Sequence, residues 1–326
     1  AAGHFHTCAI LDNGSVKCWG DNSHGQLGDG STTDRTSPVL VDLGAGNTAV
    51  DISAGHSHTC AILNDGTLKC WGQDNNGQVG DGGSNSDQNS PVTINVGSGL
   101  SAVKISAGIY HTCAVLDDGS IKCWGQNNHG QLGDGSTTTR TTPVSVHLDA
   151  GKTAFNVAVG MHHTCALVDS IVECWGKNDK YQLRNNDNGT SDVLSPVETL
   201  PAYDENDHTE IRAISAGYNH TCTITELGMH CWGDNTKRQV HSSSSQTYSR
   251  GYWQTPTENG GFGSSGSPYF QTSGVEVSYV AVSANVDRTC KITNTGWLQC
   301  FGGIPDDANL ERTYHFAETT QYPVFV

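Results

Sequence analysis

Histidine, cysteine and tryptophan recur in this chain in one fixed order, and all three side chains can do chemistry. The first copy opens with His6-Thr7-Cys8 and closes with Cys18-Trp19-Gly20. Imidazole and thiolate groups bind zinc, and two cysteines can also form a disulfide. Structural zinc sites usually place two cysteines two to four residues apart, and no pair in this chain has that spacing. The pattern therefore favours disulfides over a metal.

The residues between the two cysteines predict a β-hairpin. Apolar residues alternate on either side of Asp12-Asn13-Gly14, which is a strong turn signal. A three-residue loop puts Cys8 opposite Cys18, where Cα atoms lie roughly 4.5–5.5 Å apart, within the range of a disulfide. Two later copies lack one residue of the turn, and a shorter loop restores the opposition. The predicted disulfides are Cys8–Cys18, Cys60–Cys70, Cys113–Cys123, Cys165–Cys174, Cys222–Cys231 and Cys290–Cys300.

The hairpins recur about every 50 residues, a period typical of propellers and other β arrays. A strand ending in Ser-Ala-Gly precedes each well-preserved hairpin, and a turn-rich Gly-Gln-Leu-Gly loop and a Pro-Val strand follow it. Four short strands make one blade. We therefore predict an all-β fold: one domain over residues 1–326, six four-stranded blades, and a ring closed by the N- and C-terminal strands, with Tyr322–Val326 as the closing strand of the last blade. The predicted repeats are about 1–48, 49–100, 101–153, 154–209, 210–274 and 275–326.

The combined motif resembles the repeat of the regulator of chromosome condensation family. It runs Ala-Gly-x-x-His-Thr-Cys-Ala, Asp-Gly-x-x-x-Cys-Trp-Gly, Gly-Gln-Leu-Gly-Asp-Gly and Pro-Val, and it weakens toward the C-terminus. The resemblance implies a β-propeller, often seven-bladed, that acts as a binding scaffold. The paired cysteines resemble those of a secreted branch of such repeats. Family members include a nuclear exchange factor for a small GTPase and a secreted β-lactamase inhibitor.

The histidines and tryptophans of the motif have structural interpretations. We expect each histidine to bond the backbone of a neighbouring blade; the alternative is a metal-binding ring of histidines around a channel. We expect each tryptophan to pack between blades; the alternative is stacking on a sugar. His4, His56 and His162 are less regular and are expected toward a surface. Asp21-Asn22-Ser23-His24-Gly25, with Asp29, has some character of a calcium loop but lacks its bidentate acid. We therefore predict no cofactor, with calcium as the alternative, and no catalytic or metal site. The histidines in question are His6, His58, His111, His163 and His220.

Binding is expected where the repeat fails, because loops on a rigid scaffold often carry function. The largest insertion covers residues 241–274 and is rich in aromatic residues. The alternative is that it packs over its own blade. The candidate binding residues are Tyr248, Tyr252, Trp253, Phe262, Tyr269 and Phe270.

Charge and cysteine content limit the partners and the compartment. The net charge of −16 argues against nucleic acid and anionic membranes. No stretch is long and apolar enough to span a membrane. Twelve paired cysteines predict an oxidising compartment, so we expect a secreted or cell-surface protein. No signal peptide is visible, and a chain that starts inside a repeat is expected to be a mature or trimmed product. Three sequons are candidate glycan acceptors: Asn13, Asn188 and Asn219.

These observations predict a non-catalytic scaffold for protein–protein interaction or extracellular self-assembly, with a filament subunit as one form. One alternative is a glycan-binding propeller, with or without calcium. Another is an extracellular enzyme that acts on polysaccharides, although the chain has no nucleophile elbow, zinc-protease motif or phosphate loop.

Overall fold

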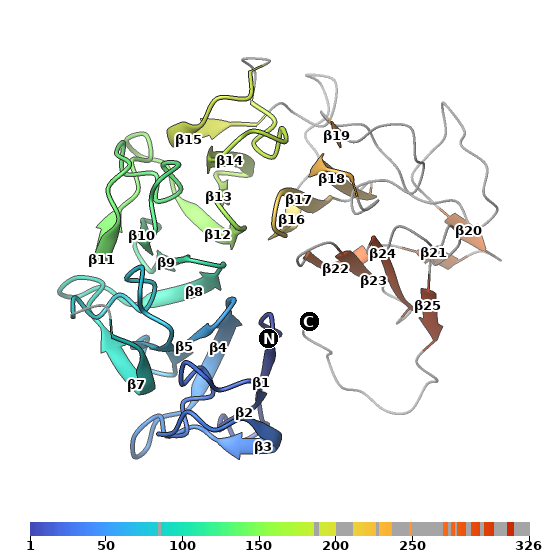
Figure 1. Ribbon diagram of the computed structural model, residues 1–326. Helices are drawn as coiled ribbons and strands as arrows, with labels where there is room; N and C mark the ends of the chain where they lie inside the picture. Colours follow the sequence, from blue (N-terminus) through green and yellow to red (C-terminus); the bar gives the residue numbers. More distant parts are fainter. Residues whose placement is uncertain are drawn as a thin grey trace.

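The computed structural model is all-β, with its sheets arranged around a common axis (Figure 1). It describes residues 1–83, 86–185, 189–199, 211–225 and 228–236, and the strand segments 248–249, 270–272, 275–277, 279–284, 288–293, 297–302 and 312–315. Each sheet is a meander of antiparallel strands, and the first strand of each four-stranded sheet lies next to the axis. The predicted propeller architecture is confirmed, whereas the limits of the repeats and the single-domain division stay predictions.

The described sheets contain 25 strands in all. The first three sheets consist of β1 (His6–Ile10), β2 (Val16–Gly20) and β3 (Arg35–Leu40); β4 (Ala49–Ala54), β5 (His58–Leu63), β6 (Leu68–Gly72) and β7 (Gln88–Ile94); and β8 (Ala102–Ala107), β9 (His111–Leu116), β10 (Ile121–Gly125) and β11 (Arg140–Ser145). The next two consist of β12 (Ala154–Val159), β13 (His163–Val168), β14 (Ile171–Gly176) and β15 (Val193–Glu198); and β16 (Ile211–Ala216), β17 (His220–Thr225), β18 (Gly228–Asp234) and β19 (Tyr248–Ser249). The last consist of the pair β20 (Phe270–Thr272) and β21 (Val275–Val277), and of β22 (Tyr279–Ala284), β23 (Arg288–Thr293), β24 (Trp297–Gly302) and β25 (Arg312–His315).

The cysteine hairpin forms the middle of every blade. Cys8 pairs with Cys18 in the register of β1 and β2, and all six predicted cysteine pairs are disulfide-bonded. Their Cα atoms lie 4.0–4.1 Å apart, closer than expected. The Cys8 N–H donates to the Ala1 carbonyl on the far side from β2, so this pair is of the more closely spaced, non-hydrogen-bonded type. Gly14 takes the left-handed turn position, with φ of 74°.

A β-bulge interrupts each inner strand at its second residue. In the second sheet, Ala49 and Asp51 pair with consecutive residues of β5, which leaves Val50 as the extra residue. The same shift leaves Val103 and Phe155 unpaired in the next two sheets. These three side chains are 46–61% exposed. The bulge therefore turns an apolar side chain outward at the end of the strand where the chain enters the blade.

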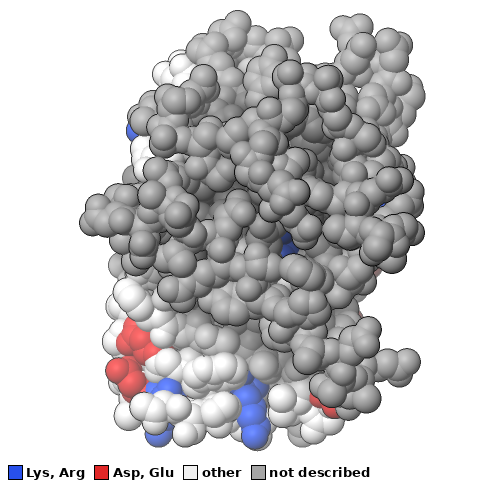
Figure 2. All heavy atoms as spheres, turned by 90° about the vertical axis from the view of Figure 1, so that its right-hand side faces the viewer, with Lys and Arg blue, Asp and Glu red and all other residues white. Residues whose placement is uncertain are grey.

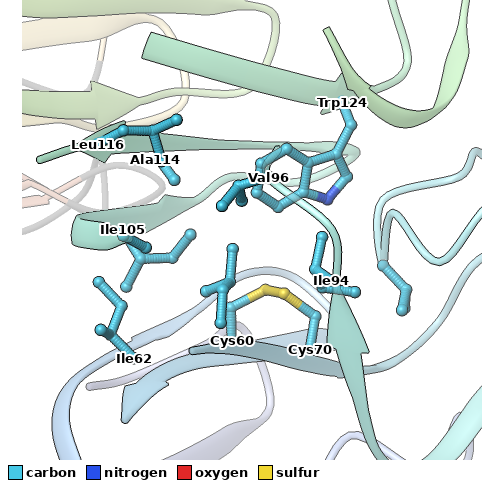
Figure 3. Packing of buried hydrophobic residues seen from close by; sticks show 12 residues of the cluster. Cys60, Ile62, Cys70, Ile94, Val96, Ile105, Ala114, Leu116 and Trp124 are labelled. Carbon is cyan, nitrogen blue, oxygen red and sulfur yellow. A yellow bond between two sulfur atoms is a disulfide. The ribbon is translucent and has the colours of Figure 1, made fainter. Parts of the chain in front are cut away.

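The apolar core is divided into clusters that lie between neighbouring blades. In the cluster shown in Figure 3, the Cys60–Cys70 disulfide of one blade faces Trp124 of the next. Trp71, Trp124, Trp175 and Trp232 are all buried in such clusters, which confirms that the tryptophans pack between blades. Trp19, in the first blade, is only partly buried.

The first sheet differs from the prediction. The first has three strands, and only Ala1–Gly3 lies along β1 where the other blades have a full inner strand. Consequently Leu11 is 39% exposed, whereas its counterparts Leu63 and Leu116 are each 1% exposed. In the last sheet, β25 pairs directly with β24. The segment Tyr322–Val326, and with it the predicted closure of the ring, lies outside the described residues.

The surface carries both signs of charge. Figure 2 turns the last sheets toward the viewer, and Lys, Arg, Asp and Glu side chains lie near one another on the described part at its lower edge. In the described part of the chain, no helix is long and apolar enough to cross a membrane.

Candidate functional site

A ring of glycines surrounds the axis where the inner strands end. Each of the first five blades contributes one glycine, and in the second to the fifth blade its carbonyl oxygen faces the Cα of the glycine in the preceding blade. A Cβ added to Gly55 would lie 2.3 Å from the Gly108 oxygen, and one added to Gly108 would lie 2.4 Å from the Gly160 oxygen. Only a residue without a side chain fits here, because the neighbouring backbone fills the space. The members are Gly3, Gly55, Gly108, Gly160 and Gly217.

The glycines line a funnel that opens at this end of the axis. Its volume is about 130 Å³, and its wall consists mainly of alanine and glycine. The two residues after each glycine form the mouth, because the chain turns there before entering the cysteine hairpin. His4, His56 and Tyr218 line the mouth, together with Ile109.

Aromatic rings continue around the mouth as an arc, which we call the axial rim. The rings of His4 and His56 stack with centroids 4.4 Å apart, and Tyr110 stacks on His56 at 6.5 Å and on His162 at 6.1 Å. Tyr218 approaches His4 to 6.2 Å. Phe5 tilts against His4 and is 60% exposed. The axial rim comprises His4, Phe5, His56, Tyr110, His162 and Tyr218.

Burial favours the neutral form of two imidazoles of the axial rim, those of His56 and His162. Burial lowers the pKa of His162 to about 4, and the positive charge that His129 would carry acts in the same direction. Burial also lowers the pKa of His56, again with help from neighbouring histidines. At neutral pH these rings therefore present flat, uncharged surfaces that combine apolar area with hydrogen-bonding edges.

The five regular histidines lie deeper and hold neighbouring blades together. His58 Nε2 lies 2.9 Å from the Thr112 hydroxyl of the next blade, and that hydroxyl donates to the Gln78 carbonyl in the same blade as His58. Because the hydroxyl hydrogen is used in this way, its oxygen must accept from Nε2–H. Trp124 Nε1 donates to the same Gln78 carbonyl. The expected bond to neighbouring backbone is thus wrong: the histidine binds a threonine side chain, which relays to the backbone.

The same histidine–threonine–glutamine relay joins four successive blade pairs. The histidine–threonine distances are 2.8–2.9 Å, and a fifth contact continues the series. The residues are His6, Thr59 and Gln26; His58, Thr112 and Gln78; His111, Thr164 and Gln131; His163, Thr221 and Gln182; and, for the fifth contact, His220 and Thr289. The described residues contain no group of three side chains placed to bind a metal.

The segment considered as a calcium loop is built from internal hydrogen bonds. Asn22 is fully buried, accepts from Leu27 N and donates to the Asp29 carboxylate. Asp29 also pairs with Arg35. The same arrangement recurs around Asn127, so these polar residues shape the loop that carries the relay glutamine.

One blade breaks this pattern with a buried acid. Asp74 replaces the loop asparagine, is 1% exposed and accepts from Val79 N. In the first blade, the Asn22 amide donates to the Asp29 carboxylate. The residue equivalent to Asp29 in this blade is Asp81, so a second carboxylate lies at that place. Burial, together with the nearby Asp81 and Asp87 carboxylates, raises the pKa of Asp74 to about 6. Ionised Asp74 therefore destabilises the folded state above pH 6.

We expect Asp74→Asn to stabilise the protein by about 3 kcal/mol at pH 7.5 and by about half as much at pH 5. The raised folded pKa means that the wild type loses stability as pH rises from 3.8 to 6, and the amide removes this loss. Urea unfolding at both pH values measures the difference. The reciprocal control is Asn127→Asp, which should introduce the same penalty into the next blade. Equal effects of Asp74→Asn at both pH values would contradict the assignment.

The sequence-predicted binding residues fall mostly outside the described part of the chain. Tyr252, Trp253, Phe262 and Tyr269 lie there, as does the sequon at Asn188. The backbone of Tyr248 pairs with Asp234 in the fifth sheet, and that of Phe270 pairs with Val277. The outer strand of the fifth blade thus lies within the range assigned to the insertion. The proposed binding role of all six residues stays a prediction.

The other two sequons are described. Asn13 is exposed at the hairpin tip, and Asn219 is partly buried beside the axial rim. The sequence does not predict this rim as a unit, although three of its histidines are expected toward a surface. The available signal was the variable pair of residues between Ala-Gly and His-Thr-Cys, where His, Tyr and Phe recur without a fixed position.

Fold and site together define a repeat propeller with an open, aromatic axial face. The chain belongs to the RCC1-like domain family, whose model matches residues 1–260. The ultraviolet-B receptor UVR8 of Arabidopsis thaliana is 32% identical over 241 residues, which cover 73% of this chain and 53% of the receptor. The human E3 ubiquitin-protein ligase HERC2 is 30% identical over 224 residues, which cover 68% of this chain and 4% of the ligase.

The fold similarity extends to a solved structure. Yeast RCC1 (Prp20), crystallised with Kap60, superposes with a TM-score of 0.71 at 20% identity and covers 93% of this chain and 69% of that one. The chain spans about half the length of UVR8 and a small part of HERC2.

Proposed function

We propose that this domain is a non-catalytic protein-binding module whose contact surface is the axial rim. The rim carries the proposal: aromatic side chains surround a funnel on a disulfide-bonded scaffold, and Phe5 exposes 60% of its surface. Protein interfaces are enriched in aromatic residues because these bury a large area at little cost in conformational entropy. The blades beneath hold the rim in place through the relay contacts, so partner binding requires little reordering.

The relatives support binding rather than catalysis. Prp20 was crystallised with the protein Kap60, and UVR8 is a receptor. HERC2 is a ligase, but this chain matches 4% of its length. A protein partner at the rim fits these comparisons without requiring a catalytic group.

We also propose that the domain works outside the cytoplasm, in a secreted or cell-surface protein. Six disulfides tie the hairpins, and none of the twelve cysteines is free. Disulfides form and persist in oxidising compartments and are rare where glutathione keeps thiols reduced. Intact-mass analysis of protein from its native compartment checks this location, because a recovered form with twelve free thiols would contradict it.

Partner capture tests the binding surface. We expect a Phe5→Ser, His56→Ala, Tyr218→Ala variant to retain the fold and to lose at least tenfold in capture of partners that cross-link to the wild type. The matched control is Val50→Ser with Val103→Ser, which changes two exposed residues at the other end of the inner strands. Circular dichroism establishes folding of both variants. Equal capture by the rim variant and the wild type would refute the proposed function.

A further inference from the structure

The funnel offers hydrogen-bond acceptors that lack donors. Gly55, Gly160 and Gly217 are buried, and their carbonyl oxygens accept no hydrogen bond from the described residues; each faces the Cα of the preceding glycine. The Gly108 oxygen, in contrast, accepts from His56 N. A buried carbonyl without a donor costs free energy, and each oxygen has two lone pairs. The wall of the funnel therefore favours a ligand that brings several N–H donors.

The charge around the funnel has one prevailing sign. No described lining residue is Lys or Arg. Asp21 acts on the imidazole of His56, and Asp179 and Asp192 act on that of His162, each raising the pKa of that imidazole. Lys177 is paired with Asp179 at 3.0 Å, which leaves an excess of acid around the rim. A cation entering here meets a favourable potential, whereas an anion is repelled.

Size and wall chemistry restrict the cation further. A volume of about 130 Å³ holds one side chain and excludes a strand or helix. Ala107, Ile109 and Val159 provide an apolar wall for an aliphatic stem. Lysine and arginine combine such a stem with three and five N–H donors, respectively.

We propose that a lysine or arginine side chain of the protein partner inserts into the axial funnel, with its head group donating to the glycine carbonyl ring. The inference rests on the proposed function, because it names the chemistry that the axial rim would recognise in its partner. Inserting one long side chain would also centre the partner on the axis and place its surface against the aromatic rim.

Tripeptide probes test the insertion directly. We expect acetyl-Gly-Arg-Gly-amide, acetyl-Gly-Lys-Gly-amide or both to shift the NMR resonances of the Ala107, Gly108 and Gly160 amides. The norleucine and glutamate tripeptides should bind at least tenfold more weakly. Ala107→Leu, which fills the funnel, should weaken the preferred basic peptide at least tenfold, and Tyr218→Ala at the mouth provides a second variant should the first not fold. Val103→Ala, at the other end of the same strand, should leave binding unchanged.

The controls separate the inference from the proposed function. If the norleucine peptide bound as tightly as the arginine and lysine peptides, the funnel would be a purely apolar pocket. If the glutamate peptide bound most tightly, the funnel would prefer negative charge. Either outcome overturns the inference. Methylguanidinium or n-butylammonium binding as tightly as its peptide would point to a free cation rather than a protein side chain. If the rim variant loses partners while no basic peptide binds, the proposed function stands and the insertion is wrong.

Discussion

Lowering the pH from 7 to 5 should remove on the order of 8 kcal/mol of folding stability, because four relay histidines are neutral in the fold and charged in the unfolded chain. Burial lowers the pKa of His6 to about 4, that of His58 and of His163 to about 3, and that of His111 well below its usual range. Nε2–H already donates to threonine, and the Nδ1 atoms of these four rings have no hydrogen-bond partner among the described residues. A second proton would therefore be buried without an acceptor.

Stability falls as the pH falls because the pKa of each of these histidines is lower in the folded state than in the unfolded chain. The contribution of each histidine is complete above about pH 6.5 and falls by ~1.4 kcal/mol per pH unit below it until the folded pKa is reached. Ordinary domains have a total stability of about 5–15 kcal/mol, so acid unfolding should set in near pH 5. Urea unfolding between pH 7.5 and 5 measures the loss, and the slope at pH 5 should report uptake of about four protons from these residues. His58→Gln should reduce this uptake by one; stability that is flat over this range would contradict the prediction.

Gly108→Ala should destabilise the protein by about 3 kcal/mol or more, because the added methyl group meets backbone that cannot move away. Its Cβ would lie 2.4 Å from the Gly160 oxygen and 2.6 Å from Val159 Cγ1. Relief would require the third and fourth blades to separate at the axis, where their inner strands pack together. The effect is steric, since Gly108 does not have the positive φ that favours glycine.

Gly83→Ala is the matched control for this steric effect. It makes the same chemical change at an exposed loop position, also without a positive φ, where the nearest described atoms to the added Cβ belong to the Asp81 carboxylate, the end of a side chain that can move. It should cost less than about 1 kcal/mol, as surface substitutions usually do. Thermal unfolding of both variants at pH 7.5 makes the comparison. A Gly108→Ala protein as stable as the control would show that the blades can spread without cost.

The repeated framework was predictable from the sequence because its causes are local. The spacing of Cys8 and Cys18 around a turn determines the hairpin, and six hairpins at one period determine the propeller. The tryptophans were assigned correctly because a large apolar side chain at a fixed place in every blade needs a partner surface. The histidine partner was not predictable, since Thr59 binds His6 only after two blades have packed.

The axial rim could not be predicted for a related reason. Its rings come from the two variable positions of each copy: His56 occupies the first and Tyr110 the second. They meet only because the glycine ring brings five loops to one point. Asp74 was likewise unremarkable as a loop residue, and only the buried position of its counterpart Asn22 shows that a carboxylate there is costly.

The relay contacts also make the blades behave like subunits of a head-to-tail ring. At four successive junctions, one blade presents a histidine and a glutamine carbonyl, and the next blade presents a threonine and a tryptophan, so these four junctions share one heterologous interface. Such an interface does not itself set the number of units; the rotation per junction does. A blade with both halves of this interface could thus be duplicated or removed by recombination without creating a new kind of contact. The ring would then need only a different rotation per junction.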